Sequence, residues 1–115
     1  MSDFSIQQTI LDENVVRLDV RGFLDAHTFE RMQSAIDRCF ADEYYRLVVN
    51  LEGVHYISSA GAGVFIGALG TAQENDGNIV FLNPTENVRE VFDLLGLSLI
   101  FTFAKDEEGA MASFQ

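Results

Sequence analysis

Two adjacent serines, Ser58 and Ser59, lie in the segment VHYISSAGAGVFIG (residues 54–67), where a β-prone apolar run passes into a run of glycine and alanine. A serine hydroxyl at such a junction can cap a helix, attack a carbonyl carbon or accept a phosphoryl group. The free N–H groups and the positive dipole end of a helix start also favour a phosphate. We therefore look for the chemistry of this chain at residues 58 and 59.

A hydrolytic nucleophile needs neighbours that this chain lacks. The nucleophile elbow has the pattern G-x-S-x-G, but Ser59 is preceded by Ile57 at the position of the first glycine and followed by Gly61. Both histidines, His27 and His55, precede Ser59, whereas the order in α/β-hydrolases is Ser, acid, His. We therefore expect that the protein is not an enzyme.

Sites for nucleotides, phosphoaspartate and metals are also incomplete. The run GAGVFIG is neither the dinucleotide fingerprint nor a P-loop, because it has no G-K-[ST]. The apolar run RLVVNL (46–51) lacks the terminal aspartate that a receiver domain would phosphorylate. The two histidines and the single cysteine, Cys39, have no metal-ligand spacing. We expect no metal and no cofactor.

The glycines after the serines have helical spacing. Gly63, Gly67 and Gly70 fall at i, i+4 and i+7 and would line one face of a helix. Close packing of a strand or a partner on this face is favoured over contact with a ligand. Residue type alone then gives the serines an N-cap role, with Ser59 or Ser58 at the cap.

Composition excludes several classes of partner. The formal net charge is -11, with 18 acidic and 7 basic residues and no basic cluster, so we expect no nucleic acid. The same charge favours a partner surface that is basic or neutral. Residues 53–73 carry no charge, but they contain five glycines and are not flanked by Lys or Arg, so we expect no membrane insertion. The single cysteine and the absence of a signal-peptide pattern indicate the cytoplasm.

Strands and helices alternate around the serines. Strands are expected at residues 3–10, 15–20, 46–51, 79–82 and 97–103, and helices from Asp25 through Phe40, over 60–73, over 83–95 and from Lys105. Asp25 and Asn83 are the expected N-caps, with Pro84 at the first helical position and Glu86 completing a capping box. The third helix should bury Val88, Val91, Phe92 and Leu95.

Repeated βαβ units predict an α/β fold: a single domain over residues 1–115 with a mostly parallel or mixed sheet of about five strands and flanking helices. In such sheets functional groups gather where strands end and helices begin. The two serines lie at one of these junctions.

The segment NLEGVHYISSAGAGVFIG (50–67) resembles the signature of the STAS domains of bacterial anti-sigma factor antagonists. That signature is a strand ending near N-L, a short connection, and a D-S-[ST]-G-L-G-V-like turn into a helix. GFLDAHTFE (22–30) resembles the family's G-x-L-D-x-x-T segment, and NPTENVREVFDLLGL (83–97) resembles its third helix. The resemblance implies a STAS-like domain over nearly the whole chain.

The resemblance also implies the site residues. Matching residues 50–51 before the serines and 61–64 after them puts the family's phosphorylated serine at Ser59, with Ser58 as the alternative acceptor. Ser58 occupies the position where many members carry Asp. The implied partner-binding residues are Asp25, Thr28, Ser58, Ser59, Ala60, Gly61 and Gly63.

A partner-switching mechanism follows from the same resemblance. The unmodified protein would bind a histidine-kinase-like anti-sigma factor, which would then use ATP to phosphorylate Ser59 and be freed. A PP2C-like, metal-dependent serine phosphatase would reset the switch, so ATP and metal belong to the partners. Two alternatives stay open: an accessory subunit that binds a transport ATPase, and a module that binds nucleotide or another small ligand.

Overall fold

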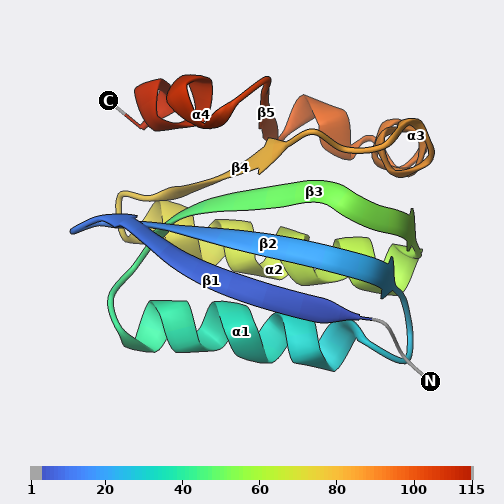
Figure 1. Cartoon of the computed structure of the whole chain (residues 1–115), viewed down its shortest axis with the longest axis horizontal. Coiled ribbons are helices and arrows are strands. Elements are labelled where there is room, and N and C mark those ends of the chain that lie inside the picture. The colour runs from blue at the N-terminus through green and yellow to red at the C-terminus, as the bar shows by residue number, and fades with distance from the viewer. Residues whose placement is uncertain (1–3, 115) are drawn as a thin grey trace.

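The structure, a computed structural model, describes residues 4–114. Its strands and helices follow the predicted alternation along the chain (Figure 1). In chain order they are β1 (Ser5–Asp12), β2 (Val15–Leu24), α1 (Phe29–Ala41), β3 (Arg46–Ile57), α2 (Ser59–Glu74), β4 (Asn78–Leu82), α3 (Glu86–Leu94), the 3₁₀ helix η1 (Leu97–Leu99), β5 (Thr102–Ala104) and α4 (Glu107–Ser113).

The five strands form one sheet whose spatial order is the same as their order in the chain. β1 and β2 are antiparallel and form a hairpin, whereas β2, β3, β4 and β5 are mutually parallel. Each parallel pair is joined through a helix, as parallel strands require. The predicted α/β domain with a mixed, mostly parallel sheet of five strands is confirmed.

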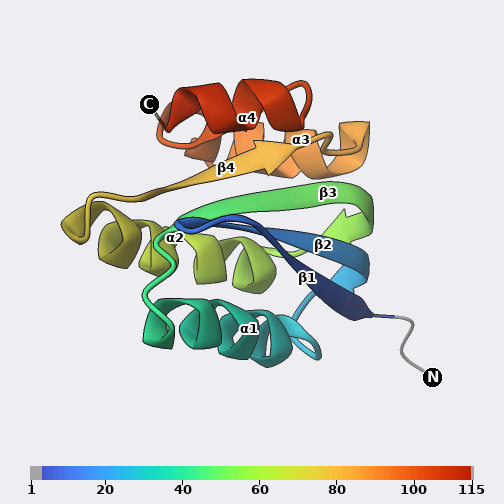
Figure 2. The same cartoon turned by 60° about the vertical axis from the view of Figure 1, so that its left-hand side comes forward.

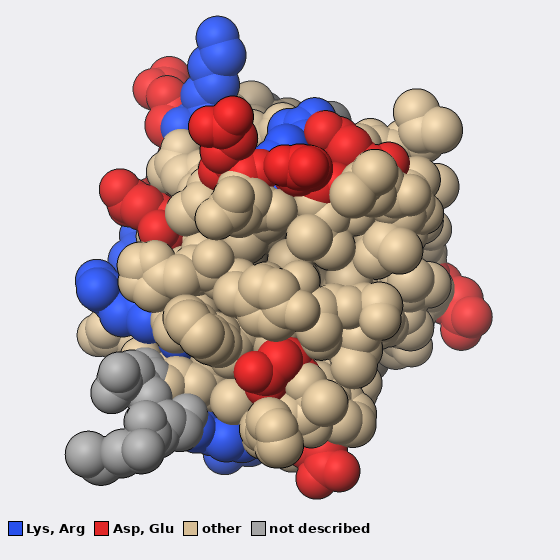
Figure 3. Space-filling model, turned by 90° about the vertical axis from the view of Figure 1, so that its right-hand side faces the viewer, with Lys and Arg blue, Asp and Glu red and all other residues tan. Residues whose placement is uncertain are grey.

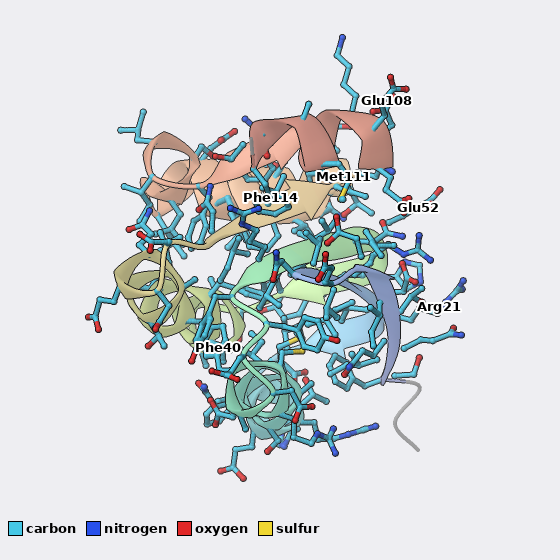
Figure 4. All side chains as sticks on the ribbon, turned by 90° about the vertical axis from the view of Figure 1, so that its left-hand side faces the viewer. Arg21, Phe40, Glu52, Glu108, Met111 and Phe114 are labelled. Atoms are coloured by element: carbon cyan, nitrogen blue, oxygen red, sulfur yellow. The ribbon has the colours of Figure 1, made fainter. Side chains whose placement is uncertain are left out.

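The helices divide between the two faces of the sheet. α1 and α2 lie side by side beneath one face (Figure 2), and α3 adds Val88 and Phe92 to the same core. α4 lies on the other face over a smaller cluster, where Met111 and Phe114 point toward the sheet (Figure 4). The buried members of this second cluster are Val15, Val48, Val80, Leu82 and Ala110. Burial on both faces of the sheet explains why residues 47–49 of β3 and 79–82 of β4 are continuously apolar rather than alternating.

α2 buries a face of small and apolar residues that includes Gly61, and it turns Gly63, Gly67 and Gly70 outward. A Cβ placed on Gly63, Gly67 or Gly70 would meet no atom within 4 Å. The expectation that a strand packs closely on this glycine face is therefore wrong within the described residues, and packing of a partner there stays a prediction. The buried residues of α2 are Gly61, Ala62, Val64, Phe65, Ala68, Leu69 and Ala72. Because both faces consist of small or apolar residues, hydrophobic contrast could not identify the buried one.

The third helix begins later than predicted. Thr85 is its N-cap, and the Thr85 Oγ1 accepts a hydrogen bond from the Val88 N–H at 3.3 Å. Asn83 has a left-handed backbone (φ 49°), so it forms a turn instead of the predicted cap. Pro84 therefore precedes the helix, and Glu86 is its first residue and not the capping-box partner.

The expected strand over residues 97–103 is wrong in its first half. Gly96 has φ 74° and turns the chain into η1, so that β5 covers only Thr102–Ala104. Leu97 and Phe101 are buried in the core, and their spacing of one helical turn was hidden by the alternating sequence LSLIFTF. Leu95 is 46% exposed and does not belong to the buried stripe of α3, because the helix has already ended.

Candidate phosphoacceptor site at the carboxyl edge of the sheet

β2 and β3 end together and bring the two predicted site segments side by side. Leu24 on β2 is registered with Ile57 on β3, so Asp25 and Ser58 leave neighbouring strands at the same edge. The Ser58 N–H donates a hydrogen bond to the Leu24 carbonyl oxygen at 2.9 Å. β3 continues well past its predicted end at residue 51, and this extension carries the chain to the edge.

The two serines have different environments. Ser58 is the N-cap of α2: its backbone is extended (φ −97°, ψ 171°), and its Oγ accepts a hydrogen bond from the Gly61 N–H at 3.2 Å. Ser59 is the first residue of the helix, its side chain is exposed, and its hydroxyl makes no hydrogen bond within residues 4–114. The cap, which the sequence left open between the two serines, is Ser58.

Gly61 sets how closely α2 approaches β2. A Cβ at this position would lie 2.5 Å from the carbonyl oxygen of Leu24 and 2.9 Å from its Cγ. Only glycine allows the backbones to come this close. Gly61 therefore positions the helix start, whereas Ala60 and Gly63 are exposed on its outer surface.

Residues 25–28 form a hydrogen-bonded turn before α1. Thr28 occupies the N-cap position without a side-chain cap, so the predicted N-cap role of Asp25 is wrong. The Asp25 carboxylate instead accepts a hydrogen bond from the His27 N–H at 2.9 Å, as Asp side chains commonly do in turns. The Thr28 hydroxyl accepts a hydrogen bond from the Asp25 N–H at 2.9 Å and donates one to the Phe23 carbonyl at 2.8 Å. Thr28 is 6% exposed, so its hydroxyl acts inside the chain and holds the turn that presents Asp25.

Charge is sparse around the start of α2. The helix has no acidic residue in its first turn, and its first charged side chain along the sequence is Glu74. Figure 3 views the molecule from the side at which β2 and β3 end and shows a broad tract almost free of Lys, Arg, Asp and Glu, with charged side chains along its margins. The first N–H groups of the helix have no partner within the helix and carry partial positive charge. This arrangement can receive either a phosphate or a weakly charged partner surface.

An open groove of about 1010 Å³ lies beside the turn at residues 25–28. Its lining includes Phe23, Asp25 and His27, and it extends to Arg21 and Glu52, which lie near each other at one side of the molecule (Figure 4). The lining combines acidic, basic and apolar groups, so no single ligand chemistry dominates it.

The single cysteine is buried, and the described residues hold no cluster of metal ligands and no helix that could span a membrane. Cys39 is buried in α1, and this burial, with a smaller contribution from Asp42, raises the pKa of its thiol to about 11. Within residues 4–114, no three side chains of His, Cys, Asp or Glu are grouped so that they could hold a metal ion. Among the same residues, no helix has the length and apolarity needed to cross a membrane.

The family model of the STAS domain matches residues 7–110. The chain is a STAS domain. This STAS domain is 30% identical over 90 residues to an anti-sigma-B factor antagonist of Staphylococcus epidermidis, and the match covers 78% of the chain and 83% of the relative. The resemblance inferred from residues 22–30, 50–67 and 83–97 is thereby confirmed.

Two solved structures extend the comparison. The anti-sigma factor antagonist SpoIIAA in its unphosphorylated form superposes on the STAS domain with a TM-score of 0.81 and 25% identity, covering 95% of each chain. The Bacillus cell fate determinant SpoIIAA in the phosphorylated form superposes with a TM-score of 0.73 and 24% identity, and the match covers 96% of this chain and 100% of the other. At 24% identity, the match to the phosphorylated form shows that the two chains share a fold.

Sequence reasoning missed an exposed aromatic pair, Phe23 and Tyr56, beside the predicted site. Strand alternation could have shown that Phe23 points outward, because it continues the outward series of Arg17, Asp19 and Arg21 on β2. No comparable signal exists for Tyr56, because β3 changes register just before it.

Proposed function

We propose that this STAS domain is an anti-sigma factor antagonist that works in the cytoplasm as a serine-phosphorylation switch. The unmodified form binds a histidine-kinase-like anti-sigma factor, and phosphorylation of Ser59 releases it. The observation that carries the proposal is the exposed, unbonded Ser59 hydroxyl at the first position of α2, next to Ser58, whose Oγ is engaged as the cap. An acceptor must expose its hydroxyl to a kinase, and Ser59 does so without breaking a bond of the fold.

The chemical step needs only the hydroxyl from this chain. The partner kinase transfers the γ-phosphoryl group of ATP to the Ser59 Oγ, the hydroxyl proton passes to a base of the kinase, and ADP leaves. A PP2C-like phosphatase hydrolyses the ester and restores the hydroxyl. The STAS domain therefore acts as a substrate and binding partner rather than as a catalyst.

The phosphate acts on the interface more than on the fold. At the start of α2 it meets unpaired N–H groups and the positive end of the helix dipole, which together are worth about 0.3 to 1 kcal/mol when exposed. At a docked interface its added charge of about −1.5 to −2 must be desolvated or matched by the partner. The free protein thus accommodates the phosphate, and the complex does not.

The relatives support the proposal by their names. The Staphylococcus epidermidis relative is an anti-sigma-B factor antagonist, and SpoIIAA, an anti-sigma factor antagonist of the same fold, has both an unphosphorylated and a phosphorylated form. We extend both properties, antagonism of an anti-sigma factor and a phosphorylated state, to this chain.

The direct test incubates the protein with the histidine-kinase-like anti-sigma factor of its own genome and ATP, followed by peptide mapping. Phosphate should appear on Ser59, and Ser59→Ala should incorporate none while still binding the kinase. Ser58→Ala is the matched control, because it removes the neighbouring hydroxyl and the N-cap, at a cost of about 1 kcal/mol in stability, but keeps the acceptor. Phosphate on Ser58 with Ser59 unmodified would overturn the assignment.

The open groove beside residues 25–28 supports a second candidate function, the binding of a small ligand. A nucleotide that raises the melting temperature in the absence of any protein partner would favour this function. Capture of a transport ATPase instead of a kinase would favour the accessory-subunit role.

A further inference from the structure

Phe23 and Tyr56 form an exposed aromatic pair at the carboxyl edge of the sheet. Phe23 is 56% exposed and Tyr56 is 48% exposed, and their ring centroids lie 6.0 Å apart with the planes tilted by 59°. Single exposed apolar residues are ordinary on soluble proteins, but aromatic side chains are enriched among the residues that dominate binding energy at interfaces. Two such rings in contact on the surface indicate a binding role.

The aromatic pair flanks both segments of the candidate site. One ring comes two residues before Asp25 and the other two residues before Ser58, and the rings are opposite each other in the register of β2 and β3. The next residues along the strands, Leu24 and Ile57, are buried in the core covered by α1 and α2. Because successive strand residues point to opposite faces, the rings lie on the other face of the sheet at the same edge.

Irregular pairing between β2 and β3 creates the aromatic pair. The register passes from Gly22 opposite Val54 directly to Phe23 opposite Tyr56, so that β3 advances by one extra residue, His55. Regular pairing would place His55 opposite Phe23 and would separate the two rings. Bulges of this kind occur next to functional sites, where they redirect a side chain.

The backbone under the aromatic pair is fixed by hydrogen bonds. The Phe23 carbonyl accepts the Thr28 hydroxyl at 2.8 Å, and the next carbonyl, that of Leu24, accepts the Ser58 N–H at 2.9 Å. The side chains of Phe and Tyr have only two torsions each, so they lose little conformational freedom when they are buried by a partner. The pair is therefore pre-positioned for docking.

We propose that the aromatic pair is the apolar anchor of the complex with the anti-sigma factor kinase and that it enters an apolar pocket whose basic groups face the groove beside Phe23 rather than Ser59. The proposal rests on the proposed function, and it adds the chemistry of the partner surface. The groove next to Phe23 is lined by three acidic residues against two arginines, and the chain has a net charge of -11, so basic groups on the partner would complement the excess of acidic charge beside the rings (Asp19, Asp25 and Glu52 against Arg21 and Arg31). A second copy of this chain would bring the same negative charge and is disfavoured as the occupant.

The test compares the affinity for the kinase, in the presence of ADP, of the unaltered protein, the double variant Phe23→Ser/Tyr56→Ser and the control Ile10→Ser. Ile10 is 57% exposed and is registered with Val16 near the start of β2, at the opposite edge of the sheet, so the control removes a matched apolar side chain away from the site. The double variant should bind at least about tenfold more weakly, equivalent to about 1.4 kcal/mol, and the control should stay within about twofold of the unaltered protein.

Melting curves establish that the variants are folded, and Tyr56→Ser alone replaces the double variant if that one does not fold. If the folded double or single variant binds the kinase with unchanged affinity, the proposal that the aromatic pair is an anchor is refuted. The proposed phosphorylation switch is unaffected by that result. If the unaltered protein does not bind the kinase, both the proposed function and the proposed role of the aromatic pair are refuted. If sedimentation shows a homodimer that the substitutions dissociate, the rings belong to a self-association surface and the kinase anchor is overturned.

Discussion

Gly61 and Gly63 are two glycines of one helix for which we predict opposite effects of alanine on stability. A Cβ on Gly61 would lie 2.5 Å from the carbonyl oxygen of Leu24, 2.9 Å from its Cγ and 3.0 Å from its carbonyl carbon. Two of these atoms are backbone atoms of a strand inside a sheet and cannot move aside alone. Overpacking of this kind costs about 1 to 3 kcal/mol, so Gly61→Ala should lower the free energy of unfolding by that amount.

Gly63→Ala should have the reverse effect. A Cβ there meets no atom within 4 Å, and the position lies inside a helix. Alanine is favoured over glycine in helices by up to about 1 kcal/mol, because glycine loses more backbone freedom on folding. The two variants should therefore differ in stability by about 1 to 4 kcal/mol.

Urea denaturation followed by circular dichroism measures both free energies directly. For a domain of this size, 1 kcal/mol corresponds to about 4 °C in melting temperature, so the two variants should melt on opposite sides of the unaltered protein. The same sign for both substitutions, or a Gly61→Ala variant as stable as the unaltered protein, would refute the close approach of α2 to β2.

Three further predictions concern the site and the core. Phosphorylation of Ser59 should weaken kinase binding by about 2 to 5 kcal/mol, roughly thirtyfold to several-thousandfold, with little change in melting temperature; a collapsed melting transition or an unchanged affinity would contradict the electrostatic account. Asp25→Lys should weaken the complex, whereas Asp25→Asn, which keeps the oxygen that accepts the His27 N–H, should keep the fold; equal binding by the Lys variant would limit Asp25 to its turn. Burial raises the pKa of Cys39 to about 11 from an ordinary value of 9.0, so the folded state keeps a proton that the unfolded state loses. The free energy of unfolding should then fall between pH 9 and pH 11 by up to about 2 kcal/mol relative to the same change in Cys39→Ala, and parallel pH profiles would contradict this.

Long periodic segments and the family signature made most of the fold predictable. The helical spacing of Met32, Ile36 and Cys39 and the alternation of Val16, Leu18 and Val20 correspond to the buried faces of α1 and β2. These patterns repeat over several turns or residues, so one misleading position does not hide them.

Element ends were less predictable, because neighbouring polar residues compete for the same bonds. Asp25 and Thr28 can both accept from nearby N–H groups, and only the packing of the turn decides that Asp25 bonds to the His27 N–H while Thr28 reaches the Phe23 carbonyl. Asn83 and Thr85 compete in the same way at α3. Tyr56 shows a different limit, since its direction depends on the register of β3 against β2, which no local pattern of β3 contains.

The order of the strands has a consequence for the shape of whatever binds this protein. In open α/β sheets, enzymes usually hold small substrates in the crevice that opens where the strand order reverses and neighbouring helices pass to opposite faces. Here the order β1-β2-β3-β4-β5 never reverses, and the crossover helices α1, α2 and α3 all contribute to the core on one face. The carboxyl edge is therefore not split by such a crevice, and apart from the open groove beside residues 25–28 it presents its turns and its helix start as an outward rim. A rim of this kind suits binding by another macromolecule, whose own concave surface would surround the turns and the helix start.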